Sequence, residues 1–411
     1  MTSAAPPVER YHGGAIAYST TDLGFCSNVF AGADWPAVEA NLLGPIRDVR
    51  ERRRLDRMTT GLWLSAAATA HLAADPAPLV DALATSGVDL VTLNGFPFGD
   101  FHAERVKQRV YTPAWDTPQR LDYTLDLARI LVRCLPARAA FGTISTLPLG
   151  YAAQWHPDRH AAALAALCRL AAALARIADE TGRAIRVCLE PEPDCVLEHT
   201  IQAIRLFTEE LPAAAQRCGV ARSAIESHLG LCFDVCHQAV QFEDIDASLR
   251  ALASAGVTVG KVQVSSALEL PEPAAAGALL GPFAEPRYLH QVRCRRADGR
   301  IVASPDLAQA LADPDLPRDG PWRVHFHVPI QHPPQGADGL GTTAPAILQA
   351  LDYLAAAPDH RPHLEVETYT WRVLPPEHRP RDTHTLTSGL CAELAWLETH
   401  LAERGLLDGD T

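Results

Sequence analysis

The sequence lacks several features that would assign it to a common class of protein. Its ten cysteines are scattered and form no C-x-x-C pair, which argues against a disulfide framework or a zinc–sulfur site. Residues 1–14, MTSAAPPVERYHGG, contain no basic region followed by an apolar stretch, so we expect no secretory signal. The other apolar runs are short and carry charged residues, which argues against a transmembrane helix. We therefore expect a cytoplasmic protein with free thiols.

Positive charge is also scarce. The chain has 36 lysine and arginine residues against 49 aspartate and glutamate residues, and its net charge is -13. This balance argues against nucleic acid as a partner and gives no sign of a basic patch for membranes. It does not exclude a small phosphorylated substrate, because local arginines can still bind one. The expected partner is a small-molecule metabolite.

Short β-like runs alternate with long helical runs, and no G-x-G-x-x-G follows the first strand. The helical run 160–182 has apolar residues at helical spacing and ends in a glycine. Repeated strand–helix–strand units predict a parallel sheet, and eight units close a (β/α)₈ TIM barrel, with a doubly wound open sheet as the alternative. The predicted strands are 23–28, 61–66, 88–95, 141–147, 184–190, 230–236, 259–265, 322–328 and 363–369.

Nine predicted strands are too many for eight barrel positions, and we predict that 322–328 is a loop or an extra strand. Segment 266–321 is too long for a simple crossover, so it is interpreted as an insertion near the barrel mouth. Segment 96–120 is a second long loop. Loops that follow barrel strands form the active-site face. With no internal repeat and no low-complexity linker, we expect one domain over 1–411.

Polar side chains gather where the later strands end. The sequence LEPEPDC (189–195) places Glu190 and Glu192 on one side of an extended chain, because residues two apart share a face. A divalent cation such as Mn²⁺, Co²⁺, Zn²⁺, Fe²⁺ or Mg²⁺ would offset the cost of burying such carboxylates. A salt bridge to Arg186 or a helix N-cap role is the alternative for each acid. The polar residues at strand ends are Glu190, Asp234, His237, Gln263, His325, His327, Glu365 and Glu367.

The order of E-P-x-P, D-x-x-H, x-H-x-H and a final glutamate resembles the xylose isomerase-like barrels, which include sugar isomerases, ketose epimerases and type IV AP endonucleases. The chain is also similar to the metabolite traffic protein EboE family. This resemblance implies a xylose isomerase-like TIM barrel, encoded with a prenyltransferase and other enzymes in clusters that move a metabolite out of the cytoplasm. A membrane prenyltransferase or another Ebo-cluster protein is then a candidate partner. The segments that carry the likeness are 23–42, 93–128, 188–198 and 364–375.

The resemblance implies a role for each matching residue. Gln263 stands where the superfamily often has His or Asp, and a neutral amide is a weaker ligand that His325 and His327 would have to compensate. Glu192 stands where sugar isomerases often have lysine, so their mechanism does not transfer intact. The implied metal ligands are Glu190, Asp234, Gln263, His327 and Glu367, with Glu365 as the alternative terminal glutamate. Glu190 or Glu367 could serve as ligand and catalytic base together. Glu192 is predicted from its position alone, as a general base close to the metal or as a partner for Arg186.

Further polar residues are predicted to contact substrate. Lys107 and Arg109 lie in FHAERVKQRVY and are read either as a lid for an anionic group or as a solvated helical face. Asn28 and Asn94 end early strands, where they could bind hydroxyl groups or cap helices. The predicted substrate-binding residues are His237, His325, Asn28, Asn94, Lys107, Arg109, Lys261 and Glu365.

Four functions are compatible with these residues. The first is a metal-dependent isomerase or epimerase acting on a sugar-like or cyclitol-like metabolite, in which a carboxylate moves a proton. The second is metal-dependent hydrolysis of a small phosphoester, as in the endonuclease branch. The third is a Schiff-base lyase that uses Lys261. The fourth is a carrier that binds the metabolite without turnover.

Overall fold

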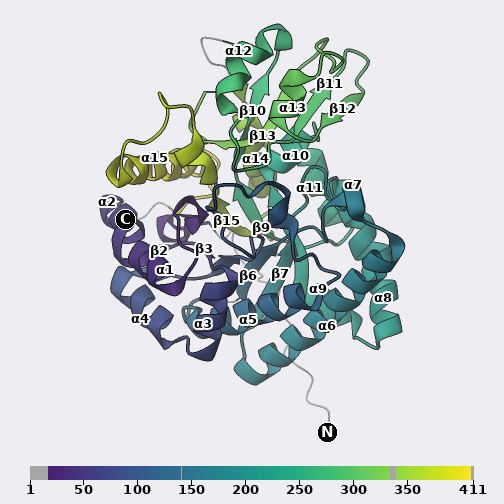
Figure 1. Ribbon diagram of the computed structural model, residues 1–411. Helices are drawn as coiled ribbons and strands as arrows, with labels where there is room; N and C mark the ends of the chain where they lie inside the picture. Colours follow the sequence, from purple (N-terminus) through teal and green to yellow (C-terminus); the bar gives the residue numbers. More distant parts are fainter. Residues whose placement is uncertain (1–16, 140, 334–338, 409–411) are drawn as a thin grey trace.

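The structure is a computed structural model that describes residues 17–139, 141–333 and 339–408 (Figure 1). The expectation that no secretory signal opens the chain concerns residues outside this description. Eight parallel strands follow one another in chain order around a ring, and each is hydrogen-bonded to the next. The barrel strands are β1 (Gly24–Phe25), β3 (Leu62–Trp63), β5 (Thr92–Asn94), β6 (Phe141–Thr146), β7 (Ala184–Leu189), β8 (Leu229–Asp234), β9 (Val259–Val264) and β15 (His363–Val366).

The ring closes between its first two strands. Cys26 and Gly61 form a parallel bridge, and the Ser27 amide donates to the Gly61 carbonyl over 2.9 Å. Strand β8 is buried along its whole length, as a barrel strand covered on both faces must be. The predicted (β/α)₈ barrel is therefore confirmed, and the doubly wound open sheet is wrong.

Helices follow the barrel strands and surround the sheet (Figure 1). The longest, α6, begins with Pro157 at its first position and ends at Gly182, whose φ of 70° only glycine adopts readily. The helices of the barrel are α1 (Trp35–Asn41), α2 (Arg47–Arg52), α3 (Ala66–Ala74), α4 (Ala77–Ser86), α5 (Pro118–Cys134), α6 (Pro157–Thr181), α7 (Thr200–Arg205), α8 (Leu211–Cys218), α9 (Arg222–His228), α10 (Val235–Val240), α11 (Ile245–Ser254), α14 (Ala344–Ala356) and α15 (Thr383–Ala402).

Helix α6 is also long and apolar enough to cross a membrane, which the sequence reading did not anticipate. Half of its most apolar window is buried inside the protein, where α6 packs against α5, α8 and α9. Packing on the barrel accounts for its composition.

A second, antiparallel sheet stands beyond one end of the barrel (Figure 1). It forms between β9 and α14, so the insertion predicted for 266–321 extends to residue 342. Strand β13, the predicted extra strand 322–328, lies at the centre of this sheet and outside the barrel. The elements of the insertion are β10 (Ser266–Leu270), α12 (Ala276–Leu280), β11 (Val292–Arg295), β12 (Ile301–Ser304), α13 (Leu307–Ala312), β13 (Trp322–Val328) and β14 (Gly341–Thr342), and a separate strand pair joins β2 (Met58–Thr59) to β4 (Val88–Asp89).

Segment 96–120 docks on the insertion. The amides of Val106 and Lys107 both donate to the Arg287 carbonyl over 2.8 Å, and part of the segment forms the 3₁₀ helix η4 (Lys107–Tyr111). A second 3₁₀ helix, η9 (Tyr369–Val373), follows β15. The barrel mouth is thus enclosed by three segments that lie far apart in the sequence.

Candidate metal centre and pocket

A cavity of about 60 Å³ opens at the carboxyl ends of the barrel strands. Its floor is polar, and its walls are apolar and aromatic. The floor residues are Asn28, Asn94, Glu190, Glu192, His237, His325 and Glu367, and the wall residues include Phe96, Phe101, Val106, Val110, Tyr111, Tyr288, Leu289 and Tyr369. Most of the side chains predicted to act together therefore meet in one place.

Three carboxylates form the base of this site, and we call Glu190, Asp234 and Glu367 the carboxylate group. One oxygen of each lies within 4.8 Å of the others, and all three residues are buried. Glu190 Oε2 and Asp234 Oδ2 have no hydrogen-bond partner among the described residues. The other oxygen of Asp234 accepts from the His237 amide and from Ser265 Oγ, at 2.9 and 2.8 Å. Asp234 thus caps α10 and keeps one oxygen free, and its predicted role as a metal ligand stays a prediction.

The structure separates Glu365 from Glu367. Glu367 Oε1 accepts from Asn28 Nδ2 and Asn94 Nδ2, each at 2.8 Å, so the two asparagines orient the carboxylate toward the floor. Glu365 instead pairs with Lys261 Nζ at 2.6 Å, and neither residue lines the pocket. Of the two glutamates, only Glu367 lines the pocket, and the ion pair of Lys261 with Glu365 gives no support to the substrate-binding roles predicted for these two residues.

Three histidines, which we call the histidine group, lie beside the carboxylates. His237 comes from α10, and His325 and His327 come from β13 of the insertion. Each Nδ1 donates its proton to a fixed oxygen: His237 to the Pro191 carbonyl, His325 to Gln291 Oε1, and His327 to the Glu367 carbonyl, over 2.9, 2.7 and 2.7 Å. Because a neutral imidazole carries one proton, each Nε2 is left with a lone pair.

The Nε2 lone pairs converge. His237 Nε2 lies 3.1 Å from His325 Nε2, although neither has a proton to donate in its neutral form. His327 Nε2 is buried without a partner among the residues described, 3.9 Å from Asp234 Oδ2. Outer-sphere carbonyls that fix a histidine tautomer are typical of metal-binding imidazoles.

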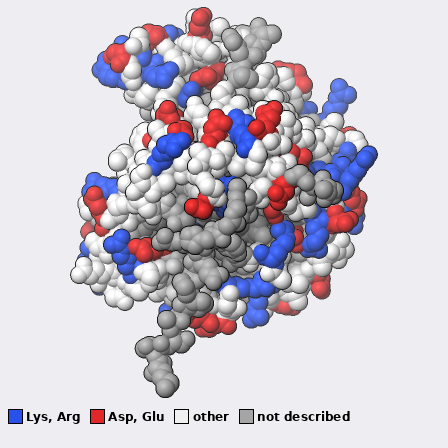
Figure 2. Space-filling view, turned by 180° about the vertical axis from the view of Figure 1, so that it is seen from behind, with Lys and Arg blue, Asp and Glu red and all other residues white. Residues whose placement is uncertain are grey.

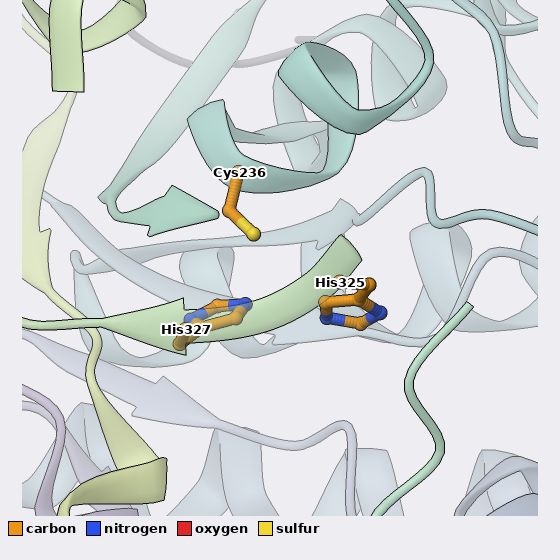
Figure 3. A group of neighbouring side chains, drawn as sticks. All are labelled: Cys236, His325 and His327. Carbon is orange, nitrogen blue, oxygen red and sulfur yellow. The ribbon is translucent and has the colours of Figure 1, made fainter. Parts of the chain in front are cut away.

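Cys236 is a neighbour that the sequence reading did not single out. Figure 3 shows its side chain reaching from α10 toward β13, where His325 and His327 lie along the strand. Its sulfur is within 4.8 Å of a nitrogen of each. The thiol also packs against Val240 and Ala267 in a small apolar cluster. Cys236 lies inside the D-x-x-H motif, and this position could have identified it from the sequence as a neighbour of the site.

Glu192 lies at the edge of the floor in a hydrogen-bonded chain. Its Oε1 accepts from the Tyr111 hydroxyl over 2.6 Å, and Gln291 Nε2 donates to the same hydroxyl over 3.0 Å. Gln291 is also the acceptor for His325. Tyr111 and Gln291 were not predicted, because each lies in a long loop whose position the sequence pattern does not fix.

Burial and mutual repulsion raise the pKa values of the glutamates of the floor. Burial, followed by the charges of Glu367 and Asp234, raises the pKa of Glu190 well above its ordinary value. Burial raises the pKa of Glu192 and of Glu367 to about 8. Burial lowers the pKa of His237 to about 4 and holds the pKa of His325 well below its usual range. Without a cation, the surroundings of Glu190, Glu192, Glu367 and these two histidines favour the neutral forms of those groups.

Other predicted substrate contacts are not available in this structure. Lys107 lines the pocket, but its Nζ pairs with Asp306 Oδ2 over 2.6 Å and contacts the Glu285 carbonyl. Arg109 is exposed and does not line the pocket, which agrees with the solvated-face reading. Gln263 is buried, and neither of its amide atoms has a partner among the described residues. Its predicted role as a ligand stays a prediction.

The donors present fit a divalent cation. Unpaired carboxylate oxygens and inward imidazole lone pairs are all electron-pair donors, and a cation would remove the repulsion among them. The described site contains no unpaired cationic side chain that would do the same, because Lys107 is taken by Asp306.

No protein-family model and no curated protein sequence matches the chain. Solved structures that resemble it include the IolI protein with a bound zinc atom, at 12% identity and a TM-score of 0.48, covering 93% of this chain and 98% of that one. An AP endonuclease of family 2 from Brucella melitensis matches at 14% identity and a TM-score of 0.37, covering 59% and 78%. A fusion of a xylose isomerase-like TIM barrel with a 4-hydroxyphenylpyruvate dioxygenase matches at 13% identity and a TM-score of 0.45, covering 94% and 45%. The barrel assignment itself rests on the strand order of this chain.

Proposed function

We propose that this chain is a xylose isomerase-like, metal-dependent enzyme of the isomerase or epimerase type that acts on a sugar-like or cyclitol-like metabolite. The observation that carries the proposal is the carboxylate group, in which unpartnered oxygens of Glu190 and Asp234 lie close to Glu367 beside a pocket that Glu190 and Glu367 line. Glu190, Asp234 and Glu367 would hold the cation, and His327 would complete the set. When bound, a divalent cation polarises neighbouring oxygens and stabilises negative charge that develops on them.

The side chains of the protein account for the remaining steps. Asn28 and Asn94 hold Glu367 in place, and the apolar walls keep water from the floor. Glu192 is the group best placed to move a proton at a substrate carbon, because it lines the pocket and is hydrogen-bonded to Tyr111. His237 and His325 face the same cavity and can bind substrate oxygens.

Metal content tests the proposal directly. We expect protein purified without chelator, or reconstituted with Mn²⁺, Co²⁺ or Zn²⁺, to hold a stoichiometric divalent ion that Glu190→Gln and Asp234→Asn both lose. Glu393→Gln is the matched control, because Glu393 is an equally buried carboxylate that is bonded to Thr368 and Trp371. Metal-loaded protein should then exchange carbon-bound hydrogen of a polyol with D₂O. No metal after reconstitution, or no exchange across a broad polyol panel, contradicts the proposal.

A metal-dependent phosphoester hydrolase is the second candidate. The histidine group favours it, because hydrolytic metal sites use several imidazole ligands. Cleavage of a generic aryl phosphate in proportion to metal content would support this function. The Schiff-base lyase is not supported. Burial disfavours the charged form of Lys261, but the neighbouring Glu365 carboxylate outweighs this effect and raises the pKa of Lys261. The amine therefore stays protonated and cannot attack a carbonyl group. Ligand binding without turnover would favour the carrier.

The likeness to the EboE family supports a narrower proposal, namely that the metabolite is handled for export in the cytoplasm. It rests on the four sequence segments alone. A membrane prenyltransferase or another protein of the same cluster would be the partner. Figure 2 shows lysine and arginine side chains intermixed with acidic ones on the face it presents, which supports a small-molecule ligand over nucleic acid. Co-purification with the membrane fraction of cells that express the prenyltransferase tests the partner.

A further inference from the structure

Three aromatic rings close over the polar floor, and we call Phe101, Tyr288 and Tyr369 the aromatic cap. The ring centroids of Phe101 and Tyr288 are 4.9 Å apart, those of Tyr288 and Tyr369 are 4.9 Å apart, and those of Phe101 and Tyr369 are 5.2 Å apart. Each ring comes from a different segment: the loop after β5, the insertion, and η9. They belong to a hydrophobic cluster separate from the main core. The aromatic cap is therefore an apolar surface that lines the pocket and is not part of the main hydrophobic core.

The free polar atoms of the floor are hydrogen-bond acceptors. Asn28 donates its Nδ2 to Glu367, which leaves Asn28 Oδ1 buried without a partner among the described residues. Glu190 Oε2 is equally unpartnered, and His237 and His325 present Nε2 lone pairs. Acceptors bind ligand hydroxyl groups, which donate, or a cation. They repel a phosphate, which at neutral pH carries about two negative charges and offers acceptor oxygens.

The charges around the pocket also disfavour phosphate. Three glutamates line it, and its one lysine, Lys107, is neutralised by Asp306 at 2.6 Å.

We propose that the substrate is an unphosphorylated polyol with an apolar face, whose hydroxyl groups bind the floor while its C–H face packs against the aromatic cap. This inference rests on the proposed function, because it names the substrate class of the same site.

Matched ligand triplets test it. We would titrate myo-inositol, D-glucose and D-fructose, each beside its O-methyl derivative and its monophosphate, into metal-loaded and metal-free protein by calorimetry. Where a triplet binds, the methyl derivative should bind about fourfold more tightly than the parent, the gain from one buried methyl group. The monophosphate should bind at least about tenfold more weakly, because it meets like charge in a partly desolvated site.

Variants test which residues cause the preference for the methyl derivative and the weak binding of the monophosphate. Phe101→Ala should remove the methyl preference, and Phe101→Leu should retain part of it if the alanine variant fails to fold. Phe98→Ala is the control, because Phe98 packs on Tyr123 at 5.0 Å and does not line the pocket. Asp306→Asn should free Lys107 and improve monophosphate binding about fivefold, since an unpaired ammonium that lines the pocket attracts phosphate.

Either of two results overturns the inference: a monophosphate that binds more tightly than its parent, or no binding by any unphosphorylated member. The outcomes separate it from the proposed function. Polyol binding with the expected ranking but no hydrogen exchange would contradict the isomerase and leave the substrate class intact. Hydrogen exchange that occurs only with a phosphorylated polyol would support the isomerase and contradict the inferred substrate class.

Discussion

Glu365 on β15 and Glu367 just after its end are both buried acids, but their surroundings differ. Glu365 and Lys261 are 1% and 0% exposed and form an ion pair at 2.6 Å inside the barrel. Glu367 is also buried, but one of its oxygens lies within 4.8 Å of oxygens of two further acids, Glu190 and Asp234. Lys261 is the counter-charge for Glu365. The carboxylate group would need a bound cation as its counter-charge.

This difference indicates a structural role for Glu365 and a functional role for Glu367. A buried pair with both partners present is a fixed part of the fold, and removing one partner is costly. A cluster of like charges destabilises the protein until a cation binds, and such clusters mark functional sites. Four changes test the contrast, in order of the expected effect.

Lys261→Met should destabilise the protein by about 3–5 kcal/mol, because it leaves Glu365 buried without a counter-charge. Urea unfolding at neutral pH measures this. The double variant Lys261→Met/Glu365→Gln should recover most of the loss. If the single variant unfolds like the parent protein, the pair is not an essential part of the barrel interior.

Glu393 offers a carboxylate of a third kind, buried with neutral hydrogen-bond donors. Burial raises its pKa to about 7 from an ordinary value of 4.5. The folded state therefore binds more protons than the unfolded state between these pH values, and stability falls as pH rises through the window, by about 3 kcal/mol in total. Unfolding of the parent and of Glu393→Gln at several pH values should show a steeper fall in the parent, because the raised pKa values of Glu190, Glu192 and Glu367 act in both proteins. Parallel slopes would contradict it.

Gly61→Ala should destabilise the protein by about 1–3 kcal/mol through overpacking. A Cβ atom at Gly61 would lie 1.4 Å from Glu365 Oε1, so the absent side chain makes room for the ion pair. Gly277→Ala in α12 is the control, because nothing lies within 4 Å of its Cβ position. That change should be neutral or stabilising by up to about 1 kcal/mol. Equal effects of the two substitutions would argue against a packing role for Gly61.

Glu367→Gln should have the smallest effect and the opposite sign. In metal-free protein it should stabilise the fold by about 1 kcal/mol, because it removes one of three mutually repelling buried acids while an amide oxygen still accepts from Asn28 and Asn94. Thermal unfolding after chelator treatment measures this. Adding a divalent ion should stabilise the parent and not the variant. Destabilisation of the metal-free variant would show that Glu367 is structural.

The barrel was predictable because strand and helix periodicities are local properties of the sequence. Polar residues at the ends of β7 and β8 also predicted where Glu190 and Asp234 would meet, since carboxyl ends of parallel strands share one edge. The choice between Glu365 and Glu367 could not be made this way, because residues two apart share a face. Only the position of Lys261 on the neighbouring strand decides it.

The insertion was harder to predict. Its length showed that 266–321 is not a crossover, but β10 to β12 are short, and β10 joins β11 in one sheet only through β13, which pairs with both. The hydrogen-bonded chain of Tyr111, Gln291 and His325 depends on how two long loops dock. Such docking is set by tertiary contacts that leave no periodic signal.

The route of β13 has an evolutionary consequence. The insertion replaces the loop after β9, the strand that carries Gln263, and the same insertion brings His325 and His327 to the site. Loops on this face of a barrel tolerate change far better than the strands do. The proposed ligand set is split between the barrel strands and this insertion, so exchanging the insertion would replace His325 and His327 and leave the acids of the barrel in place.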